Sequence, residues 1–228
     1  WEAMEKDGFP WWGDRLGAGF ELYDLLRIDH FRAFASYWAV SAGAKSAKEG
    51  EWCKGPGSAL FQALSDRISG EIIAEDLGVF GEDVVALLKE TGFPGMRVIQ
   101  FGFDPQGDST HLPHNYLANT VAYVGTHDNN TLLGWLWEAT PQEREFALDY
   151  CGAPREGWEK GGSNAPACRR IIESVWRSHA DRAVISYQDM CGFGRDARMN
   201  TPGTADGNWL FRTTAEAMEA LDSAYYKR

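Results

Sequence analysis

The feature that most constrains the fold of this chain is an alternation between helix-like stretches and short apolar runs. Five runs are nearly continuous in apolar residues, at 24–29, 71–76, 96–101, 120–125 and 183–189. Stretches with helical periodicity come before or between them, at 9–23, 58–69, 82–91 and 167–180. Strands that are buried on both faces have continuously apolar sequences, and their alternation with helices is typical of parallel β/α units.

Such units build two common folds, the (β/α)8 barrel and the dinucleotide-binding fold. The second is disfavoured because the chain contains neither a GxGxxG nor a GxxxxGKS/T motif. We therefore predict an α/β fold in which residues 1–228 form one domain, the C-terminal part of a (β/α)8 TIM-type barrel with about five β/α units. The chain starts at Trp1, inside a helix-like stretch and without an initiator Met, so we expect the N-terminal units of the barrel to be missing. The Gly and Pro content of residues 152–166 predicts a surface loop.

Charge and cysteine content argue against several classes of protein. The chain has 228 residues with 22 basic and 33 acidic side chains, which give a formal charge of −11. Such a surface repels phosphate backbones and anionic lipid head groups, so we expect neither nucleic acid nor a membrane as a partner. No apolar run approaches the roughly 18 residues of a membrane span, and the first residues show no signal-peptide pattern. Because the four cysteines form no CxxC pair, we predict free thiols in a reducing compartment: Cys53, Cys151, Cys168 and Cys191.

Carboxylates follow three of the apolar runs. The acids are Asp29, Glu75 and Asp128, and bases or histidines stand near them at Arg27, His30 and His127. In β/α barrels the catalytic groups lie at the carboxyl ends of the strands, where several strands contribute side chains to one mouth. A single acid in such a place is more often a helix cap or a surface carboxylate. Three of them at the ends of different strands favour a catalytic site.

The types and spacing of these residues suit a retaining glycosidase mechanism. Such enzymes use two carboxyl groups about 5–5.5 Å apart, one as nucleophile and one as acid/base. Arg27 lies two residues before Asp29, so both side chains lie on one face of a strand and the guanidinium would orient an ionised nucleophile. Glu75 follows apolar residues, as a partly desolvated general acid should. Asp128 would bind sugar hydroxyls and stabilise the developing oxocarbenium charge.

Other candidate residues have ambiguous roles in the sequence. His111 and His114 form an HxxH pair in a proline-flanked segment, but no third ligand is near, so we expect no metal site. Asp189 ends the last apolar run and would either face the mouth of the barrel or cap a helix. Trp52 and Trp209 would be either sugar-stacking residues or part of the core.

Six segments resemble those of a known family. RIDHFRAF (27–34), IIAEDLG (72–78), GTHDNNT (125–131) and MNTPGTADGNW (199–209) resemble landmark segments of 4-α-glucanotransferases. These enzymes are also called amylomaltases or disproportionating enzymes and form glycoside hydrolase family 77. EWCKGPG (51–57) and LPHNY (112–116) resemble further family segments, in the same order. The resemblance runs from Trp1 nearly to the C-terminus and implies that three β/α units precede this piece.

The resemblance also implies roles for individual residues. Asp29 would be the nucleophile, Glu75 the acid/base and Asp128 the stabiliser of the transition state. The candidates for substrate binding are Arg27, His127, Trp52, Phe101, His114 and Asn129. No metal and no cofactor is implied. The chain departs from the family with Ala33 in place of a Gly and Asn130 in place of an Asp, which puts acceptor binding in question.

The expected function is therefore that of a 4-α-glucanotransferase, which moves α-1,4-glucan segments between maltooligosaccharides by double displacement. One alternative is an α-amylase-like hydrolase that uses the same three acids. Another is a truncated, inactive glucan-binding remnant, because an open sheet exposes apolar edges. The expected partners are maltooligosaccharides, α-1,4-glucans and the missing N-terminal part of the same barrel. We expect a cytoplasmic protein, with a plastid as the alternative location.

Overall fold

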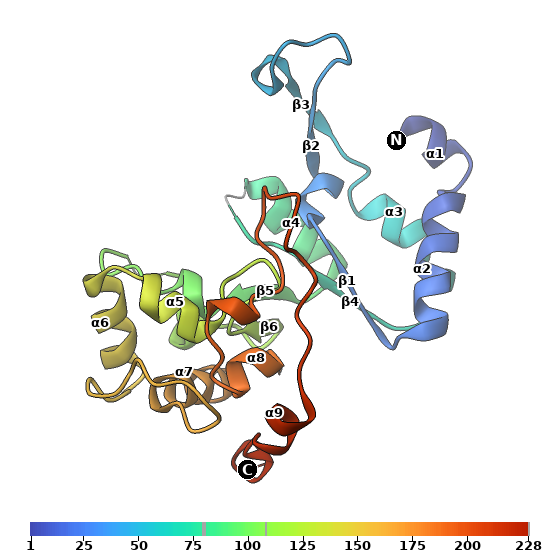
Figure 1. The fold of residues 1–228 in the computed structure, drawn as a ribbon. Coiled ribbons are helices and arrows are strands. Elements are labelled where there is room, and N and C mark those ends of the chain that lie inside the picture. Colours follow the sequence, from blue (N-terminus) through green and yellow to red (C-terminus); the bar gives the residue numbers. More distant parts are fainter. Residues whose placement is uncertain (79–80, 108, 228) are drawn as a thin grey trace. The chain divides into compact units, whose positions relative to one another are not determined.

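The computed structural model describes residues 1–78, 81–107 and 109–227 and divides the chain into two compact units, Trp1–Met96 and Arg97–Arg228 (Figure 1). We refer to them as the N-terminal and the C-terminal unit. Each unit has a hydrophobic cluster of its own. The prediction of one partial barrel over residues 1–228 stays a prediction.

The N-terminal unit joins short helices to two pairs of strands. Its helices are α1 (Glu2–Lys6), α2 (Pro10–Leu22), α3 (Ser58–Ala63) and α4 (Glu82–Thr91), with 3-10 turns η1 (Phe31–Phe34), η2 (Ala47–Glu49) and η3 (Ser65–Arg67). Its strands are β1 (Leu25–Ile28), β2 (Ser36–Ala39), β3 (Glu51–Lys54) and β4 (Glu71–Ala74). β1 and β4 pair in parallel, as expected of β/α units, with Leu25 opposite Glu71 and Ile28 opposite Ala74. The first two predicted strands are confirmed.

Phenylalanine rings fill the core of the N-terminal unit. Phe31 is fully buried, and its ring centroid lies 5.7 Å from that of Phe61 and 6.0 Å from that of Phe93. Phe31 belongs to the η1 turn that follows β1, so the chain leaves this strand directly into the core. This packing fixes the direction in which the end of β1 presents its next residues.

The antiparallel pair β2–β3 was not predicted. Its register places Trp38 opposite Trp52, and the indole nitrogen of Trp38 donates to the carbonyl of Ala47 at 2.7 Å. Cross-strand aromatic pairs of this kind stabilise a strand ladder. The sequence between the two strands contains no short turn motif that would have predicted their pairing.

The C-terminal unit contains a sheet in the order β5-β6-β7, formed by β5 (Gly95–Val98), which spans the unit boundary, β6 (Thr120–Tyr123) and β7 (Arg182–Val184). Its helices are α5 (Leu132–Glu138), α6 (Pro141–Tyr150), α7 (Pro166–Trp176), α8 (Tyr187–Met190), α9 (Ala215–Glu219) and α10 (Ser223–Tyr226). The described residues of this unit also form the 3-10 turns η4 (Ile99–Phe101), η5 (Pro113–Asn115) and η6 (Arg195–Ala197). β6 and β7 are parallel.

The last predicted strand is too long. Residues 183–189 were expected to be extended, but β7 ends at Val184 and α8 begins at Tyr187. The reason is local, because the Ser186 hydroxyl accepts the backbone N–H of Asp189 at 3.1 Å and so caps a helix. The predicted loop at 152–166 is confirmed up to Pro166, which opens α7.

In the part of the chain that the structure describes, the strand pairs do not form one continuous ladder. Among the described residues, the hydrogen-bonded sheets are β1-β4, β2-β3 and β5-β6-β7. The α/β class is therefore confirmed, whereas the closed (β/α)8 barrel stays a prediction. Within the described ranges, none of the helices combines the length and the apolar character that crossing a membrane requires.

Asp189 caps a helix, which was one of the two alternatives for this residue. Its carboxylate accepts the backbone N–H of Leu132, the first residue of α5, at 2.6 Å. The side chain is buried, and desolvation raises the pKa of Asp189 to about 6. Cys168 faces the same carboxylate, and burial raises the pKa of this thiol to about 12, so it stays neutral.

The raised pKa of Asp189 predicts a pH-dependent stability. The folded state retains a proton on Asp189 between about pH 4 and 6, where the unfolded state has lost it. The stabilisation that Asp189 gives the folded state is therefore fully present below the pKa of the unfolded state, and it is lost as the pH rises through about 6. We expect a loss on the order of 3 kcal/mol in the free energy of unfolding across this interval.

Urea unfolding at several pH values measures this effect. Asp189→Asn keeps an acceptor for the Leu132 N–H but cannot titrate. The free energy of unfolding of this variant should therefore not show the fall between about pH 4 and 6. Asp206→Asn, the same change on an exposed loop residue, serves as the control and should keep it. Equal pH profiles for the wild type and Asp189→Asn would contradict the prediction.

Candidate active site

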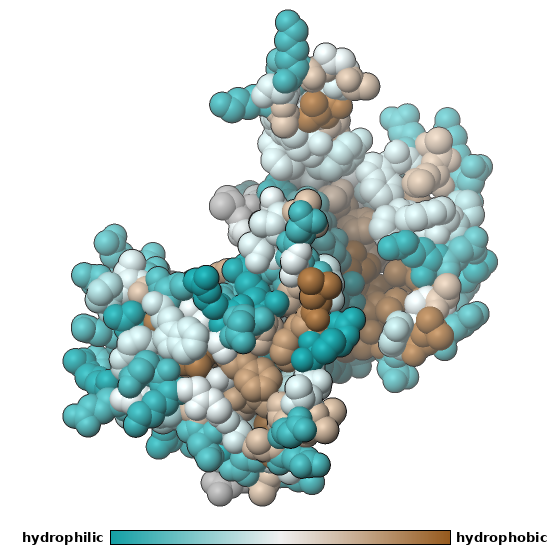
Figure 2. Space-filling model, in the orientation of Figure 1, coloured by the Kyte–Doolittle hydropathy of each residue, from teal (hydrophilic) through white to brown (hydrophobic). Residues whose placement is uncertain are grey.

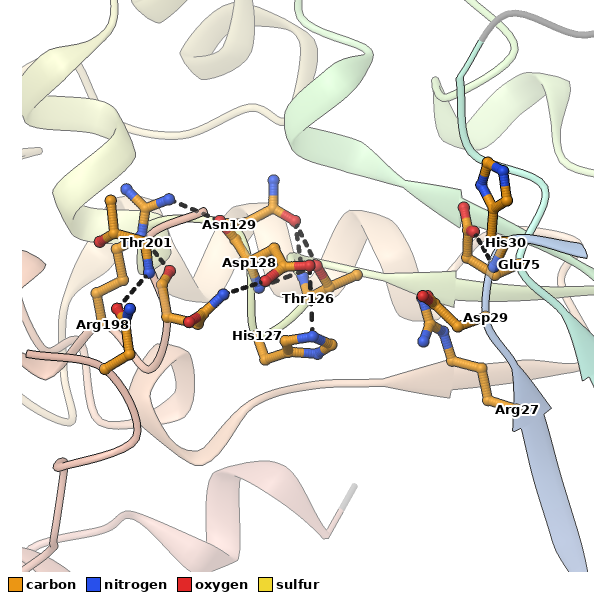
Figure 3. A network of polar contacts seen from close by, with 12 residues as sticks. Arg27, Asp29, His30, Glu75, Thr126, His127, Asp128, Asn129, Arg198 and Thr201 are labelled. Atoms are coloured by element: carbon orange, nitrogen blue, oxygen red, sulfur yellow. Dashed lines mark hydrogen bonds and ion pairs between the residues drawn. The ribbon is translucent and has the colours of Figure 1, made fainter. Parts of the chain in front are cut away.

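Asp29 and Glu75 follow the last registered residues of two neighbouring parallel strands. Backbone hydrogen bonds continue beyond the strands, because Glu75 N–H donates to the Ile28 carbonyl at 3.0 Å and Phe31 N–H donates to the Glu75 carbonyl at 3.1 Å. The two acid-bearing segments are therefore held side by side at the carboxyl ends of β1 and β4 (Figure 3).

Arg27 forms the expected ion pair with Asp29. The guanidinium Nη2 lies 2.9 Å from Asp29 Oδ1, which confirms that the two side chains share one face of β1 (Figure 3). A second contact holds the guanidinium in place, because Arg27 Nε donates to the sulfur of the buried Met96 at 3.1 Å. The Asp29 side chain is 76% exposed. A supported cation thus orients a carboxylate that remains accessible to a ligand.

Glu75 is held by backbone amides. Its Oε2 accepts the N–H of His30 at 2.7 Å, and its Oε1 accepts the N–H of Leu77 at 2.8 Å. His30 adopts a left-handed conformation with φ 49° and directly follows Asp29. The hydrogen bond therefore ties the Glu75 carboxylate to the backbone beside Asp29. His30 acts here through its amide.

A hollow of about 720 Å³ adjoins Asp29 in the N-terminal unit. It lies between α2 and β1, and Arg27 and Asp29 belong to its lining together with Trp11, Trp12 and Leu26. Figure 2 shows apolar surface between these two elements. Asp29 therefore stands at the border between an apolar surface and a charged strand end.

Asp128 belongs to the C-terminal unit and lies in a turn after β6. The turn is closed by Asn129, whose Oδ1 accepts from both the N–H and the hydroxyl of Thr126 at 2.9 Å. His127 Nε2 lies 3.3 Å from Asp128 Oδ2 (Figure 3). Both side chains are about half exposed. His127 and Asp128 are thus brought together as predicted, whereas the oxygen of the Asn129 amide holds the turn.

Two further residues hold Asp128 and were missed by the sequence analysis. Asn200 Nδ2 donates to Asp128 Oδ1 at 2.6 Å, and Arg198 Nη2 donates to the Asp128 carbonyl at 2.6 Å. Arg198 Nε also donates to the carbonyl of Asn200 at 2.8 Å. The segment 199–209, which resembles a family motif, contains Asn200, and this was the signal that could have found it.

The remaining candidates for substrate binding have their described contacts outside these two networks. Trp52 is 56% exposed, and the Arg32 guanidinium lies 4.4 Å from its ring centroid. Phe101 is 48% exposed and meets the ring of His111 edge-on at 5.6 Å. His114 Nδ1 lies 2.8 Å from the Tyr150 hydroxyl. Their roles in binding substrate stay predictions, but Trp52 is clearly not a core residue.

The HxxH pair is engaged in hydrogen bonds with the protein. His111 Nδ1 accepts the backbone N–H of Val98 at 3.1 Å, and His114 contacts Tyr150. In the part of the chain that the structure describes, no three His, Cys, Asp or Glu residues are placed to hold a metal ion.

Asn130, where the resemblance led us to expect an Asp, contacts an acid. Its Nδ2 donates to Glu138 Oε2 at 2.9 Å, and Arg195 lies 3.7 Å from the other oxygen of Glu138. An Asp at this position would bring two carboxylates together and cause repulsion. The amide nitrogen therefore suits Glu138, whereas the amide oxygen is buried without a hydrogen-bond partner among the residues that the structure describes.

Comparisons with known proteins agree with the motifs. A family model described as 4-alpha-glucanotransferase matches residues 1–217. The 4-alpha-glucanotransferase of Streptococcus pneumoniae is 44% identical over 221 residues, which cover 96% of this chain and 42% of that protein. The chloroplastic/amyloplastic 4-alpha-glucanotransferase of Solanum tuberosum is 46% identical over 226 residues, with 98% and 38% covered.

A solved structure shows the same fold. The amylomaltase from Streptococcus agalactiae in complex with acarbose matches with a TM-score of 0.90 and 35% identity, over 100% of this chain and 45% of the other. The chain thus spans about two fifths of the length of the curated relatives it matches. Since the family model covers nearly all of the sequence, the chain belongs to the 4-α-glucanotransferase family, glycoside hydrolase family 77.

Proposed function

We propose that this chain is the acid-bearing part of a 4-α-glucanotransferase that moves α-1,4-glucan segments between maltooligosaccharides. The observation that carries the proposal is the pair of strand ends in the N-terminal unit. There the Arg27–Asp29 ion pair stands beside Glu75, whose carboxylate is bound by two amides. In a member of this family, such a pair supplies an oriented nucleophile and a fixed acid/base.

The proposed reaction is a double displacement. Asp29 attacks the anomeric carbon while Glu75 gives a proton to the leaving glycosidic oxygen, and a covalent glucosyl ester of Asp29 forms. Glu75 then takes the proton from the 4-hydroxyl of an incoming glucan, which attacks the anomeric carbon and releases Asp29. Asp128 binds sugar hydroxyls and opposes the positive charge of the transition state. No cofactor takes part in these steps.

We further propose that preceding β/α units complete a (β/α)8 barrel around this chain. The relatives are more than twice as long as the part that matches. In the described residues β1 has a strand partner on one side only, β4, and α2 carries exposed Trp11 and Leu22. An unpaired strand edge and exposed apolar side chains are typical of a surface that another element covers.

The cellular location is inferred from the relatives, which include bacterial enzymes and chloroplastic/amyloplastic ones. We propose a cytoplasmic enzyme, with a plastid enzyme as the alternative.

Product analysis tests the proposed activity. Residues 1–217 are grafted into the Streptococcus pneumoniae relative in place of the aligned segment, and this grafted enzyme is incubated with maltotriose. Transfer gives glucose together with oligosaccharides longer than maltotriose. An α-amylase-like hydrolase gives only shorter sugars, and this outcome would refute the proposal.

The mechanism requires a defined distance between the acids. The carboxyl groups of Asp29 and Glu75 should lie about 5–5.5 Å apart, with Asp128 at the same mouth. A crystal structure of the grafted enzyme with bound acarbose measures both features. A separation beyond roughly 9 Å, or Asp128 turned away from the sugar, would remove the retaining mechanism.

Asn200 should affect the rate through Asp128. Asn200→Ala removes an oriented donor to a carboxylate, so we expect kcat for maltotriose transfer to fall about tenfold. Asn200→Asp should cost more, because it places a second carboxylate against Asp128. Asn164→Ala, an exposed loop residue of the same unit, is the control. An unchanged kcat in Asn200→Asp would show that this contact does not serve the reaction.

A further inference from the structure

The segment 199–209 folds as a closed loop in the C-terminal unit. Its ends meet where Trp209 N–H donates to the Met199 carbonyl at 2.7 Å. Across the loop, Thr201 N–H donates to Asn208 Oδ1 at 2.8 Å, and Asn208 Nδ2 donates to the Thr204 carbonyl at 3.0 Å. These bonds give the loop its own shape, so its two ends keep a fixed position relative to each other.

Both ends of the loop contact the acid site of the C-terminal unit. Near one end, Asn200 binds the carboxylate of Asp128. At the other end, the ring of Trp209 lies against that of His127, with 5.2 Å between the centroids and 36° between the planes. The loop therefore places an indole next to the histidine and the acid.

Trp209 has a backbone conformation that bulky residues rarely adopt. Its φ is +62°, in the left-handed region that favours glycine. Burial does not explain a tryptophan here, because the side chain is 55% exposed. Strained residues of this kind cluster at ligand-binding sites, where the strain places a side chain for contact with a ligand.

The surroundings of Trp209 define the chemistry of that ligand. An exposed indole offers an apolar face, whereas Asp128 and His127 beside it offer a carboxylate and an imidazole. The guanidiniums of Arg198 on the Asp128 carbonyl and of Arg212 on the Trp209 carbonyl offset the charge of the carboxylate, so the surroundings favour neither an anion nor a cation. A neutral sugar has the complementary surfaces, since its C–H groups form an apolar face and its hydroxyls project at the ring edge.

We propose that Trp209 is a substrate-contacting residue that stacks on one glucosyl unit, while His127 and Asp128 bind hydroxyls of the same unit. This inference rests on the proposed function, because it takes the ligand to be an α-1,4-glucan. It decides between the two roles that the sequence allowed for Trp209, stacking or core, in favour of stacking.

Binding to the 228-residue chain is tested by NMR of the tryptophan indole N–H groups. Trp209→Phe identifies the signal of Trp209, because that signal disappears in the variant. Trp176→Phe identifies in the same way a control residue, which is 41% exposed and packs on Tyr226 of the same unit. Added maltotriose should shift the Trp209 signal and leave that of Trp176 in place. A Trp209 signal that moves no more than that of Trp176 would overturn the proposal.

Kinetics of the grafted enzyme separate stacking from backbone strain. Trp209→Gly removes the ring and takes the left-handed conformation without strain, whereas Trp209→Ala removes the ring and keeps the strain. Both should raise KM for maltotriose by roughly two- to tenfold. Trp209→Phe, which keeps a ring, should stay nearer to the wild type.

The outcomes distinguish this inference from the proposed function. If the grafted enzyme performs transfer and Trp209→Gly has an unchanged KM, the stacking role is wrong and the function stands. If the grafted enzyme with Trp209 in place performs no transfer, the proposed function is wrong, and the NMR titration still decides whether Trp209 binds sugar.

Discussion

Replacement of Asp29 by Asn is expected to lower the rate of maltotriose transfer in the grafted enzyme by a factor on the order of 10⁴–10⁶. An amide has the shape of the carboxylate but is far less nucleophilic, so no covalent ester forms. It also cannot form an ion pair with Arg27, whose guanidinium lies 2.9 Å from Asp29 Oδ1 in the wild type. The measurement is the initial rate at which glucose and longer oligosaccharides appear.

A matched control exists at the other end of the same strand. Asp24 precedes β1 and is exposed at the opposite end from Asp29. Asp24→Asn removes the same charge from the same segment and should keep close to the wild-type rate. Near wild-type transfer by Asp29→Asn would show that another group is the nucleophile.

The role of Glu75 is separated from that of Asp29 by chemical rescue. Glu75→Ala should be nearly inactive on maltotriose, because no acid protonates the leaving oxygen. An activated glucosyl donor such as a glucosyl fluoride does not need this proton. Azide can replace the acceptor sugar, because it attacks without a base to remove a proton. Azide should therefore partly restore turnover of that donor in Glu75→Ala, and it should not do so in Asp29→Asn.

The parts of the site that local sequence patterns determine could be predicted. The apolar runs of β1 and β4 end in carboxylates, and the two-residue spacing of Arg27 and Asp29 placed both on one face of the strand. The bounds of α4 were also predicted correctly, because Gly92 ends this helix in a left-handed conformation with φ 69°. In each case the signal lies within a few residues.

Contacts between distant segments could not be predicted. Asn200 binds Asp128 across 72 positions, and Asp189 caps α5 across 57. A hydrogen bond of this kind depends on how the elements pack, and no period in the sequence reflects it. Helix α6 was also not predicted, although its start has a local signal in the sequence. Thr140 and Glu143 form a capping box, which apolar periodicity does not reveal.

Exposure of the proposed catalytic groups limits what the chain is expected to do alone. The Asp29 side chain is 76% exposed and that of Asp128 48%. Retaining transfer requires that water is kept from the covalent intermediate while an acceptor sugar reaches it. Within the described residues, β1 pairs with β4 alone, and the barrel units that we propose to precede it would supply additional walls around the acids.

The 228-residue chain by itself should therefore have no useful transferase activity, although it contains all three acids. A positional error of about 1 Å can lower a rate on the order of a hundredfold, and a barrel without the preceding units that we propose permits larger errors. Water would also compete with the acceptor, so any remaining chemistry should favour hydrolysis.

Addition of the N-terminal part of the Streptococcus pneumoniae relative, as a separate fragment or in one chain, should restore transfer. The test is disproportionation of maltotriose by the purified chain with and without that fragment. Robust formation of longer maltooligosaccharides by the chain alone would contradict the prediction, whereas failure of both forms would favour an inactive glucan-binding remnant.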